Sequence, residues 1–340
     1  MIRPASPPPA RPWLLADIGG TNARFGWMAV DSEEIQHVAT LRGAAYAGPA
    51  AAAQAYLVQL QQTLGAAYRP PVAGAFAVAT AVGGDHIAFT NSGWAFSCAA
   101  VERELALQPL LILNDFEALA LSLPRLKAHQ LRAWSGTAAG SLPGTLAVIG
   151  PGTGLGVAGL VPTAHGFVAV PGEGGHATLA AADDFESDLL AAARREHPHV
   201  SAERLLSGIG LPVLHAAVGA VLGTPVPPAA PGAPALNAGD IVERGLAGGD
   251  AVCSQTLDSF CALLGSFAGN VALTLGARGG VYIGGGIVPR LGRRFAELPF
   301  REHFEDKGRF RAYLEAIPTW VITAEAPALV GAARALDADT

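Results

Sequence analysis

Two short glycine turns in the chain could bind phosphate through backbone N–H groups. Each turn follows an apolar run that predicts a strand and precedes another, so each is expected to form the tip of a hairpin. They comprise Gly19, Gly20, Thr21 and Asn22 near the start of the chain, and Gly152, Thr153 and Gly154 further along. Successive N–H groups that converge on one point bind phosphate without a lysine. An ordinary tight turn explains either one alone equally well, but their recurrence favours a two-sided phosphate clamp.

The carboxylate of Asp17 lies at the end of the first predicted strand, two residues before the first glycine turn. A carboxylate there would repel phosphate unless a cation lay between them. Mg²⁺ suits this position because it keeps several waters and bridges to phosphate oxygens. The pattern predicts a magnesium ion held by Asp17 mainly through water, with a purely structural turn residue as the alternative.

Asn114 and Asp115 follow the apolar run at residues 110–113, which predicts a short buried strand, and precede a predicted helix at 116–123. Ligands of open α/β sheets bind beyond the carboxyl ends of the strands. Asp115 could act there as a general base. A helix N-cap is an equally good explanation, because both residue types favour that position.

A glycine-rich segment at residues 171–177 places Glu173 and His176 three residues apart. The pair could bind sugar hydroxyls or a metal ion, but the further ligands of a typical metal site are not nearby in the sequence. Glu203 follows Ser201 at the start of a predicted helix, where an acidic residue also stabilises the helix dipole.

Two nucleotide-binding patterns need separate treatment. Residues 154–159 fit GxGxxG, but a dinucleotide site requires a helix after the glycines, and the following residues 157–161 predict a strand. An NAD-dependent oxidoreductase is therefore disfavoured. The Walker A pattern is absent, so any use of ATP needs a different phosphate-binding fold.

Predicted strands and helices alternate along the chain, which indicates an α/β protein with mainly parallel central strands and added hairpins. Aligning residues 20–21 with 152–153 superposes strand, glycine turn and strand at a separation of 132 residues. This recurrence predicts two related α/β halves.

Composition excludes several other classes of protein. The 340 residues are 51% hydrophobic, which is too apolar for a disordered chain. The net charge of −6 and the lack of a long basic run argue against a nucleic-acid partner. Three cysteines with no CxxC spacing argue against a disulfide framework or a cysteine zinc site, and favour a cytoplasmic location.

Residues 259–277 form the best candidate for a membrane span, but they include three glycines and several polar residues. We therefore expect a buried helix packed closely against a sheet, and no membrane partner. The proline-rich residues 1–12 predict a disordered tail, and the uncharged, proline-rich residues 223–239 predict a surface loop.

Taken together, these segments resemble the bacterial glucokinase family over residues 14 to about 333. The resemblance rests on LLADIGGTNARFG (14–26), TNSGWAFS (90–97), LNDFEALAL (113–121), GPGTGLGVAGL (150–160), PGEGGHA (171–177), SAERLLSG (201–208), GGVYIGGGIVPR (279–290) and FEDKGRF (304–310). The chain lacks the cysteine-rich zinc motif of the ROK relatives, so it is similar to the zinc-free, ATP-dependent members.

The resemblance implies a two-domain actin-like ATPase (ribonuclease H-like) fold with a cleft between the domains. We expect a small α/β domain at residues 13–124 that resumes at 317–340, and a large α/β domain at 125–316. It also implies site residues. The two glycine turns resemble the phosphate motifs, and a third turn resembles the adenosine-binding motif: Gly284, Gly285 and Gly286. The implied sugar ligands are Asn114, Asp115, Glu173, His176 and Glu203, with Asp115 as the catalytic base.

The implied activity is a glycolytic one, the ATP- and Mg²⁺-dependent phosphorylation of D-glucose at its 6-hydroxyl, by a cytoplasmic homodimer. Two alternatives stay open at this point. One is a kinase for another hexose such as mannose or glucosamine, and the other is a sugar or nucleotide sensor without catalysis.

Overall fold

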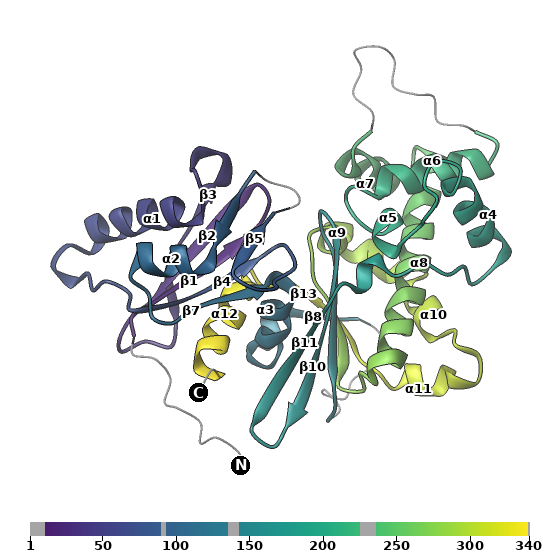
Figure 1. The fold of residues 1–340 in the computed structure, drawn as a ribbon. Coiled ribbons are helices and arrows are strands. Elements are labelled where there is room, and N and C mark those ends of the chain that lie inside the picture. The colour runs from purple at the N-terminus through teal and green to yellow at the C-terminus, as the bar shows by residue number, and fades with distance from the viewer. Residues whose placement is uncertain (1–10, 90–92, 135–142, 225–235, 339–340) are drawn as a thin grey trace, which may run out of the picture. The chain divides into compact units, whose positions relative to one another are not determined.

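The computed structural model describes residues 11–89, 93–134, 143–224 and 236–338 (Figure 1). Most of the predicted tail and of the predicted loop at 223–239 lies outside these residues, as do residues 90–92 of one resemblance segment. The chain divides into two compact units. The first comprises residues 1–126 and 324–340, and the second comprises residues 127–323.

A five-stranded sheet with the order β3-β2-β1-β4-β7 forms the centre of the first unit. Strands β1, β4 and β7 are parallel to one another, whereas β2 and β3 extend the sheet as antiparallel hairpins. Its strands are β1 (Trp13–Ile18), β2 (Asn22–Met28), β3 (Ile35–Arg42), β4 (Ala73–Val78) and β7 (Leu110–Asn114). A separate two-stranded sheet pairs β5 (His86–Ala88) with β6 (Ala95–Ser97).

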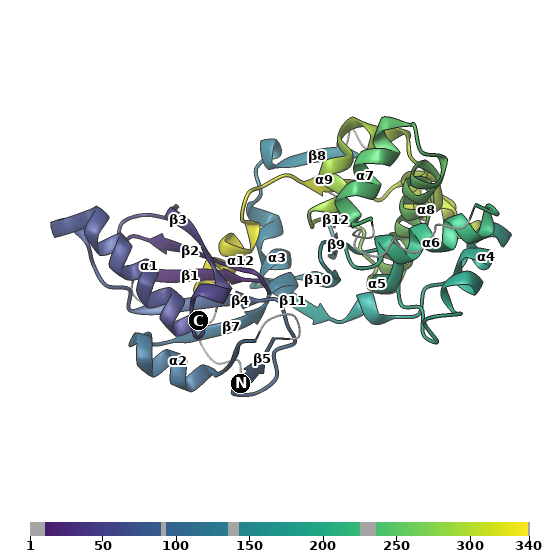
Figure 2. The ribbon, with the colours of Figure 1, turned by 90° about the horizontal axis from the view of Figure 1, so that it is seen from above.

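Helices cover both faces of this sheet (Figures 1 and 2). They are α1 (Pro49–Leu64), α2 (Cys98–Leu105), α3 (Asp115–Ser122) and α12 (Pro327–Ala338). Successive side chains of β1 point to opposite faces of the sheet, so they pack against different helices. Leu14 and Ile18 pack in the cluster that contains residues of α1, whereas Leu15 packs with Leu329 and Leu336 of α12.

The second unit contains a six-stranded sheet with the order β11-β10-β9-β12-β13-β8. Its strands are β8 (Leu131–Trp134), β9 (Leu146–Pro151), β10 (Leu155–Thr163), β11 (Gly166–Gly172), β12 (Gly280–Ile283) and β13 (Thr319–Ile322). Apart from β8, this order and these directions repeat those of the first unit. The predicted relation between two halves is therefore confirmed. The first hairpin tip has four residues between the paired Ile18 and Ala23, and the second has three between Pro151 and Leu155. The strands after the tips thus align at the expected separation of 132 residues, and the strands before them at 133.

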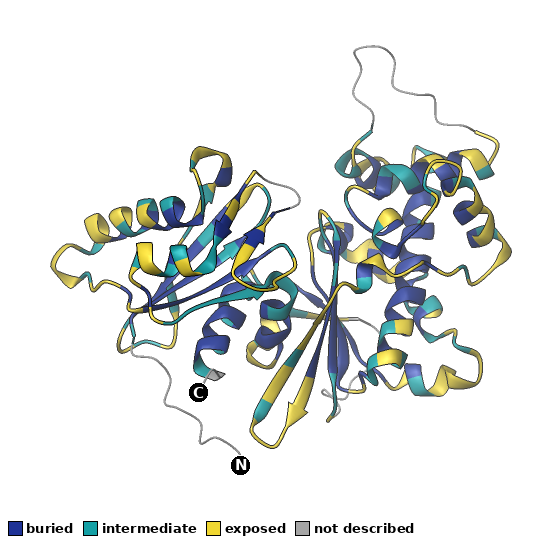
Figure 3. Ribbon diagram, viewed as in Figure 1, coloured by how far each residue is buried: buried dark blue, intermediate teal, exposed yellow. Residues whose placement is uncertain are grey.

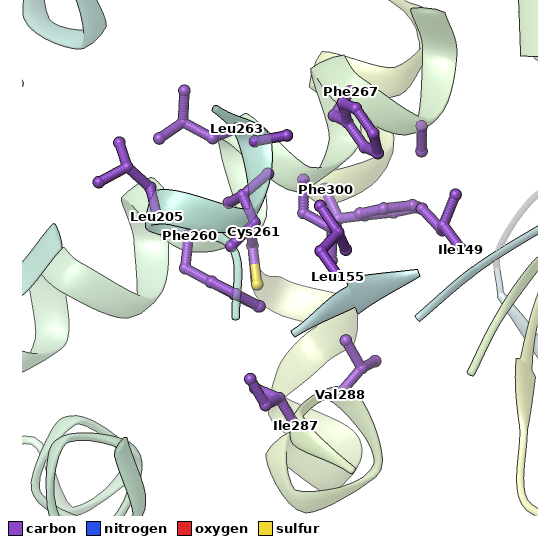
Figure 4. Close-up of a cluster of buried hydrophobic side chains, with 14 of the residues drawn as sticks. Ile149, Leu155, Leu205, Phe260, Cys261, Leu263, Phe267, Ile287, Val288 and Phe300 are labelled. Carbon is purple, nitrogen blue, oxygen red and sulfur yellow. The ribbon is translucent and has the colours of Figure 1, made fainter. Parts of the chain in front are cut away.

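Helices in the second unit surround one large apolar core. They are α4 (Asp184–Ala193), α5 (Ala202–Leu205), α6 (Leu211–Val221), α7 (Ala238–Ala247), α8 (Ala251–Leu275), α9 (Ile287–Leu291), α10 (Phe300–Glu305) and α11 (Arg311–Glu315). The close-up in Figure 4 shows part of this core, to which β9, β10, α5, α8, α9 and α10 contribute through Ile149, Leu155, Leu205, Phe260, Ile287 and Phe300. The sheet and the helices are thus held by one continuous set of buried side chains.

Helix α8 is the predicted buried helix, and it begins eight residues earlier than expected. Within the described residues it is the one helix long and apolar enough to cross a membrane, yet 78% of its most apolar stretch is buried in the unit (Figure 3). Its glycines approach another helix rather than a sheet, since a Cβ on Gly265 would lie 2.1 Å from the carbonyl oxygen of Phe300 in α10. Gly269 meets Phe304 of α10 in the same way.

The division of the chain differs from the expected one near the C-terminus. The sequence predicts that residues 317–340 belong to the small domain, but β13 hydrogen-bonds to β12 and so belongs to the sheet of the second unit. The first unit resumes at Ala324, and α12 then packs on its sheet.

Candidate active site

The first glycine turn joins β1 to β2 as a four-residue hairpin tip between the paired Ile18 and Ala23. The N–H of Gly19 donates to the carbonyl of Asn22 at 2.9 Å, and the N–H of Gly43 donates to the carbonyl of Thr21 at 2.9 Å. The first bond closes the tip on itself, and the second ties it to the segment that follows β3. No hydrogen bond within the described residues uses the N–H groups of Gly20 or Thr21, so both can donate to a phosphate.

A pocket of about 360 Å³ adjoins this turn within the first unit. Its walls come from the turn, from the segment that follows β3 and from the two residues before β6: Gly19, Gly20, Gly43, Ala44, Tyr46, Ala47, Gly93 and Trp94. The indole N–H of Trp94 donates to the carbonyl of Tyr46 at 3.0 Å, which closes one wall. Because glycine and alanine line most of the pocket, a ligand could approach the backbone closely.

The carboxylate of Asp17 is half-buried on β1, opposite Arg24 on β2. The Nη1 atom of Arg24 lies 3.3 Å from Oδ2 of Asp17. Burial raises the pKa of Asp17, and the charge of Arg24 only partly offsets this effect. Arg24 was not among the residues predicted from the sequence, although a four-residue tip between Ile18 and Ala23 pairs these two positions across the hairpin. A carboxylate held in this way is an oxygen donor of the kind that Mg²⁺ prefers.

Asn114 caps helix α3. Its Oδ1 accepts from the N–H groups of Phe116 and Glu117, and its Nδ2 donates to the carbonyl of Thr80 at 3.2 Å. Asp115 is the first residue of the helix, and its Oδ1 accepts from the N–H of Phe116 at 3.0 Å. The predicted buried strand before them is wrong in one respect, because β7 is an edge strand whose residues are only half-buried.

The second glycine turn joins β9 to β10 through a three-residue tip, one residue shorter than the first. The N–H of Gly152 donates to the carbonyl of Gly154, and the N–H of Gly208 donates to the carbonyl of Gly152 at 2.7 Å. Within the described residues, the N–H groups of Thr153 and Gly154 make no hydrogen bond. This turn therefore offers a second pair of unused donors.

The third glycine turn, Gly284, Gly285 and Gly286, lies against the second one. The N–H of Gly284 donates to the carbonyl of Ile149 at 2.7 Å. Gly285 has a φ of +74°, and a Cβ on it would lie 2.4 Å from the carbonyl oxygen of Pro151. Only glycine fits this position, so the structure brings together two turns that are more than 130 residues apart in the sequence.

Glu173, His176 and Glu203 lie close together in the second unit. The Nε2 atom of His176 is 4.0 Å from Oε2 of Glu173, and its Nδ1 atom is 3.9 Å from Oε1 of Glu203. The side chains of Glu173 and His176 are about 60% exposed, whereas that of Glu203 is 22% exposed. The imidazole thus lies between two carboxylates, which together can accept and donate hydrogen bonds to hydroxyl groups.

Glu203 also connects these residues to the second glycine turn. Its Oε2 accepts from the N–H of Leu155, the residue that follows the turn, at 2.8 Å. It lies in the first turn of α5, after the cap Ser201, as the sequence indicated. The GxGxxG pattern at residues 154–159 instead runs into strand β10, which is inconsistent with a dinucleotide-binding fingerprint.

The glucokinase family model matches residues 14–339 of the chain. The chain belongs to this family. A glucokinase of Aromatoleum aromaticum is 48% identical over 327 residues, which cover 96% of this chain and 95% of the relative. A glucokinase of Chromobacterium violaceum is 48% identical and is covered to 90% of its length by a match to 97% of this chain.

Solved structures of glucokinases share the fold. A glucokinase from an Antarctic psychrotroph has 37% sequence identity and a TM-score of 0.83, with 96% of this chain and 98% of that chain covered. The fold of this glucokinase family member is accordingly the two-domain α/β architecture of the actin-like ATPases. Its candidate site residues fall into two groups, one on the first unit around Asp17 and Asp115, and one on the second unit around Gly154 and Glu203.

Proposed function

We propose that the chain transfers the γ-phosphoryl group of ATP to the 6-hydroxyl of D-glucose, which gives glucose 6-phosphate and ADP. The hydrogen bond from Leu155 to Glu203 carries this proposal. This bond holds the Glu203 carboxylate, which suits sugar hydroxyls, against the first residue of β10, directly after the turn proposed to bind phosphate. The relatives that share this architecture at 48% identity are themselves named glucokinase.

Sugar recognition would use the carboxylates and the imidazole of the second unit together with Asn114 and Asp115. Glu173 and His176 are exposed and would lose water when a sugar binds, so each needs a hydroxyl partner in return. A site built in this way rejects a sugar that lacks one hydroxyl, because a desolvated polar group is then left unpaired.

Phosphoryl transfer would begin at Asp115, which accepts the proton of the 6-hydroxyl as that oxygen attacks the γ-phosphorus. The new O–P bond forms while the bond to the bridging oxygen breaks, and ADP leaves. The unused N–H groups of Gly20, Thr21, Thr153 and Gly154 would donate to the phosphoryl oxygens, where charge spreads in the transition state. The turn at Gly284–Gly286 would bind the adenosine.

Asp17 would hold Mg²⁺ through water. Its half-buried carboxylate beside the first turn fits that ion, which takes oxygen ligands and keeps most of its waters. When bound, Mg²⁺ supplies positive charge that offsets the charge of the phosphates. Asp17 itself needs only to remain ionised and to stay oriented by Arg24.

A coupled assay of ADP formation over a panel of hexoses tests the proposed reaction. We expect the highest kcat/KM with glucose, and no turnover with 6-deoxyglucose, which keeps the other hydroxyls but lacks the acceptor oxygen. Higher kcat/KM with mannose or glucosamine would assign the chain to another hexose. If the protein binds glucose but consumes no ATP with any sugar of the panel, it is a sensor rather than a kinase.

We also propose that the protein is a cytoplasmic homodimer that acts in glycolysis. The support is the resemblance to bacterial glucokinases described above. Light scattering coupled to size exclusion would give the mass of a dimer, and the mass of a single chain would exclude the homodimer.

A further inference from the structure

A cluster of three potential metal ligands lies in the second unit among residues that the proposed reaction does not use. It consists of His215 on α6, Asp250 at the N-cap of α8 and Cys253 in the first turn of α8. One ligand atom from each residue lies within 4.8 Å of the other two. The cluster therefore joins the middle of one helix to the start of another.

The side chains of this cluster are held in place by burial and hydrogen bonding. His215 is 4% exposed and Cys253 is fully buried. The Oδ1 atom of Asp250 accepts from the N–H of Cys253 at 3.0 Å, as an N-cap residue does. A ligand site needs little rearrangement when its side chains are already confined in this way.

The distance between the sulfur and the nitrogen matches a shared metal ion. The Sγ atom of Cys253 lies 3.4 Å from Nε2 of His215. In tetrahedral zinc, bonds of about 2.3 Å to sulfur and 2.05 Å to nitrogen place those two ligand atoms about 3.5 Å apart. A carboxylate oxygen of Asp250 lies within 4.8 Å of the other two ligand atoms, so it can complete the third position after a shift of at most about 1.4 Å.

We propose that His215, Asp250 and Cys253 bind one Zn²⁺ ion, with water as the fourth ligand. This mixed-ligand site between two helices differs from the cysteine-rich zinc motif that the sequence lacks. The thiol of Cys253 gives up its proton to solvent as the Zn–S bond forms, because only the thiolate is a good ligand. A thiolate, a carboxylate and a neutral imidazole carry two negative charges, which the ion balances. The bound ion would tie α6 to α8 and stabilise the second unit.

One nearby positive charge opposes the ion. Arg244, exposed on α7, acts electrostatically on both His215 and Cys253. Water screens an exposed guanidinium, so its effect on affinity is modest. Arg244→Gln is therefore expected to bind zinc more tightly than the parent protein.

Competition with a chromophoric chelator, on protein first stripped of metal, tests the proposal. The parent is Cys98→Ser, because Cys98 is a partly exposed thiol outside the cluster. We expect one Zn²⁺ per chain in this parent and at least about tenfold weaker binding in Cys253→Ser and His215→Gln. Unchanged affinity in both variants, or no stoichiometric binding in the parent, would overturn the proposal.

Asp250→Asn separates ligation from folding. Asparagine caps helices as well as aspartate does, so this variant keeps the start of α8 and loses only the anionic ligand. Its zinc affinity should fall while its melting temperature without metal stays near that of the parent. Zinc should raise the melting temperature of the parent by a few degrees and that of Cys253→Ser by less.

Cobalt provides a direct view of the sulfur ligand. Co²⁺ bound in place of Zn²⁺ should give a thiolate-to-cobalt charge-transfer band in the parent protein. The band should be absent in Cys253→Ser and retained in Cys261→Ser, whose thiol is buried further along α8. A band that persists in Cys253→Ser would show that another thiol binds the metal.

Discussion

The carboxylate of Glu203 accepts a hydrogen bond from the backbone N–H of Leu155, with 2.8 Å between nitrogen and Oε2. The bond crosses from the first turn of α5 to the strand residue that follows the second glycine turn. It leaves Glu203 only 22% exposed and aims its other oxygen toward His176. Glu203, proposed to bind the sugar, is thus hydrogen-bonded to the residue after the turn that is proposed to bind phosphate, so a shift of one should move the other.

This coupling explains why residue 154 is glycine. A Cβ there would lie 2.4 Å from Oε2 of Glu203, so Gly154→Ala must displace the carboxylate or break its bond to Leu155. We expect the dissociation constant for glucose, measured by calorimetry, to rise about tenfold or more, as loss of a charged hydrogen bond implies. Gly249→Ala is the matched control, because a Cβ on Gly249 meets nothing. Equal glucose affinity in both variants would contradict the role of Glu203.

The contact between the second and third glycine turns gives a prediction about stability. Gly285→Ala would place a Cβ against Pro151 and force a side chain into positive φ. We expect a loss of about 1–3 kcal/mol in the free energy of unfolding, measured by urea denaturation, and a higher KM for ATP. Gly286→Ala, whose Cβ has open space, should keep the stability of the wild type. Similar losses in both would show that the contact with Pro151 is unimportant.

We predict that the ionised carboxylate of Asp17 lowers the stability of the fold but is needed for activity. Because burial raises its pKa in the folded protein, folding binds a proton, and stability falls as pH rises through that raised value. The penalty is fully present once the pH exceeds that raised value. Asp17→Asn should therefore raise the melting temperature at neutral pH, without nucleotide or metal, while it lowers kcat.

Asp85 lies in the same unit, and its pKa is shifted in the opposite direction to that of Asp17. Hydrogen bonds from the hydroxyl of Ser97 and the N–H of Ala99 lower the pKa of Asp85, so its ionised form stabilises the fold. Asp85→Asn should lower the melting temperature at neutral pH. If Asp17→Asn also lowered the melting temperature, burial would not be the main influence on the pKa of Asp17.

Local pattern was enough to predict the parts of the fold that carry the glycine turns. Strands β1, β9 and β12 are fully or almost fully buried, so their apolar runs stand out beside the glycines. Strands β3 and β11 were missed because much of each is exposed and its sequence mixes polar and apolar residues. The assignment of residues 317–323 was wrong because only pairing with β12 reveals where β13 belongs.

The sequence was enough to predict which residues form the candidate site, but not which contacts they make with one another. The sequence identified Glu203, yet its bond to Leu155 joins segments 48 residues apart and depends on how α5 packs. Arg24 was missed because its relation to Asp17 comes from hairpin register. Gly285 was expected to bind adenosine, and its close approach to Pro151 is visible only in three dimensions. The catalytic roles of these residues stay predictions.

The kcat of Asp115→Ala with glucose and ATP tests the central claim most directly. Loss of the general base should lower kcat about 10²–10⁴-fold, with glucose and ATP still bound. Glu117→Gln removes another carboxylate from the first turn of α3 and should keep kcat within about tenfold, below the range for a general base. Near-normal production of glucose 6-phosphate by Asp115→Ala would contradict the proposed mechanism.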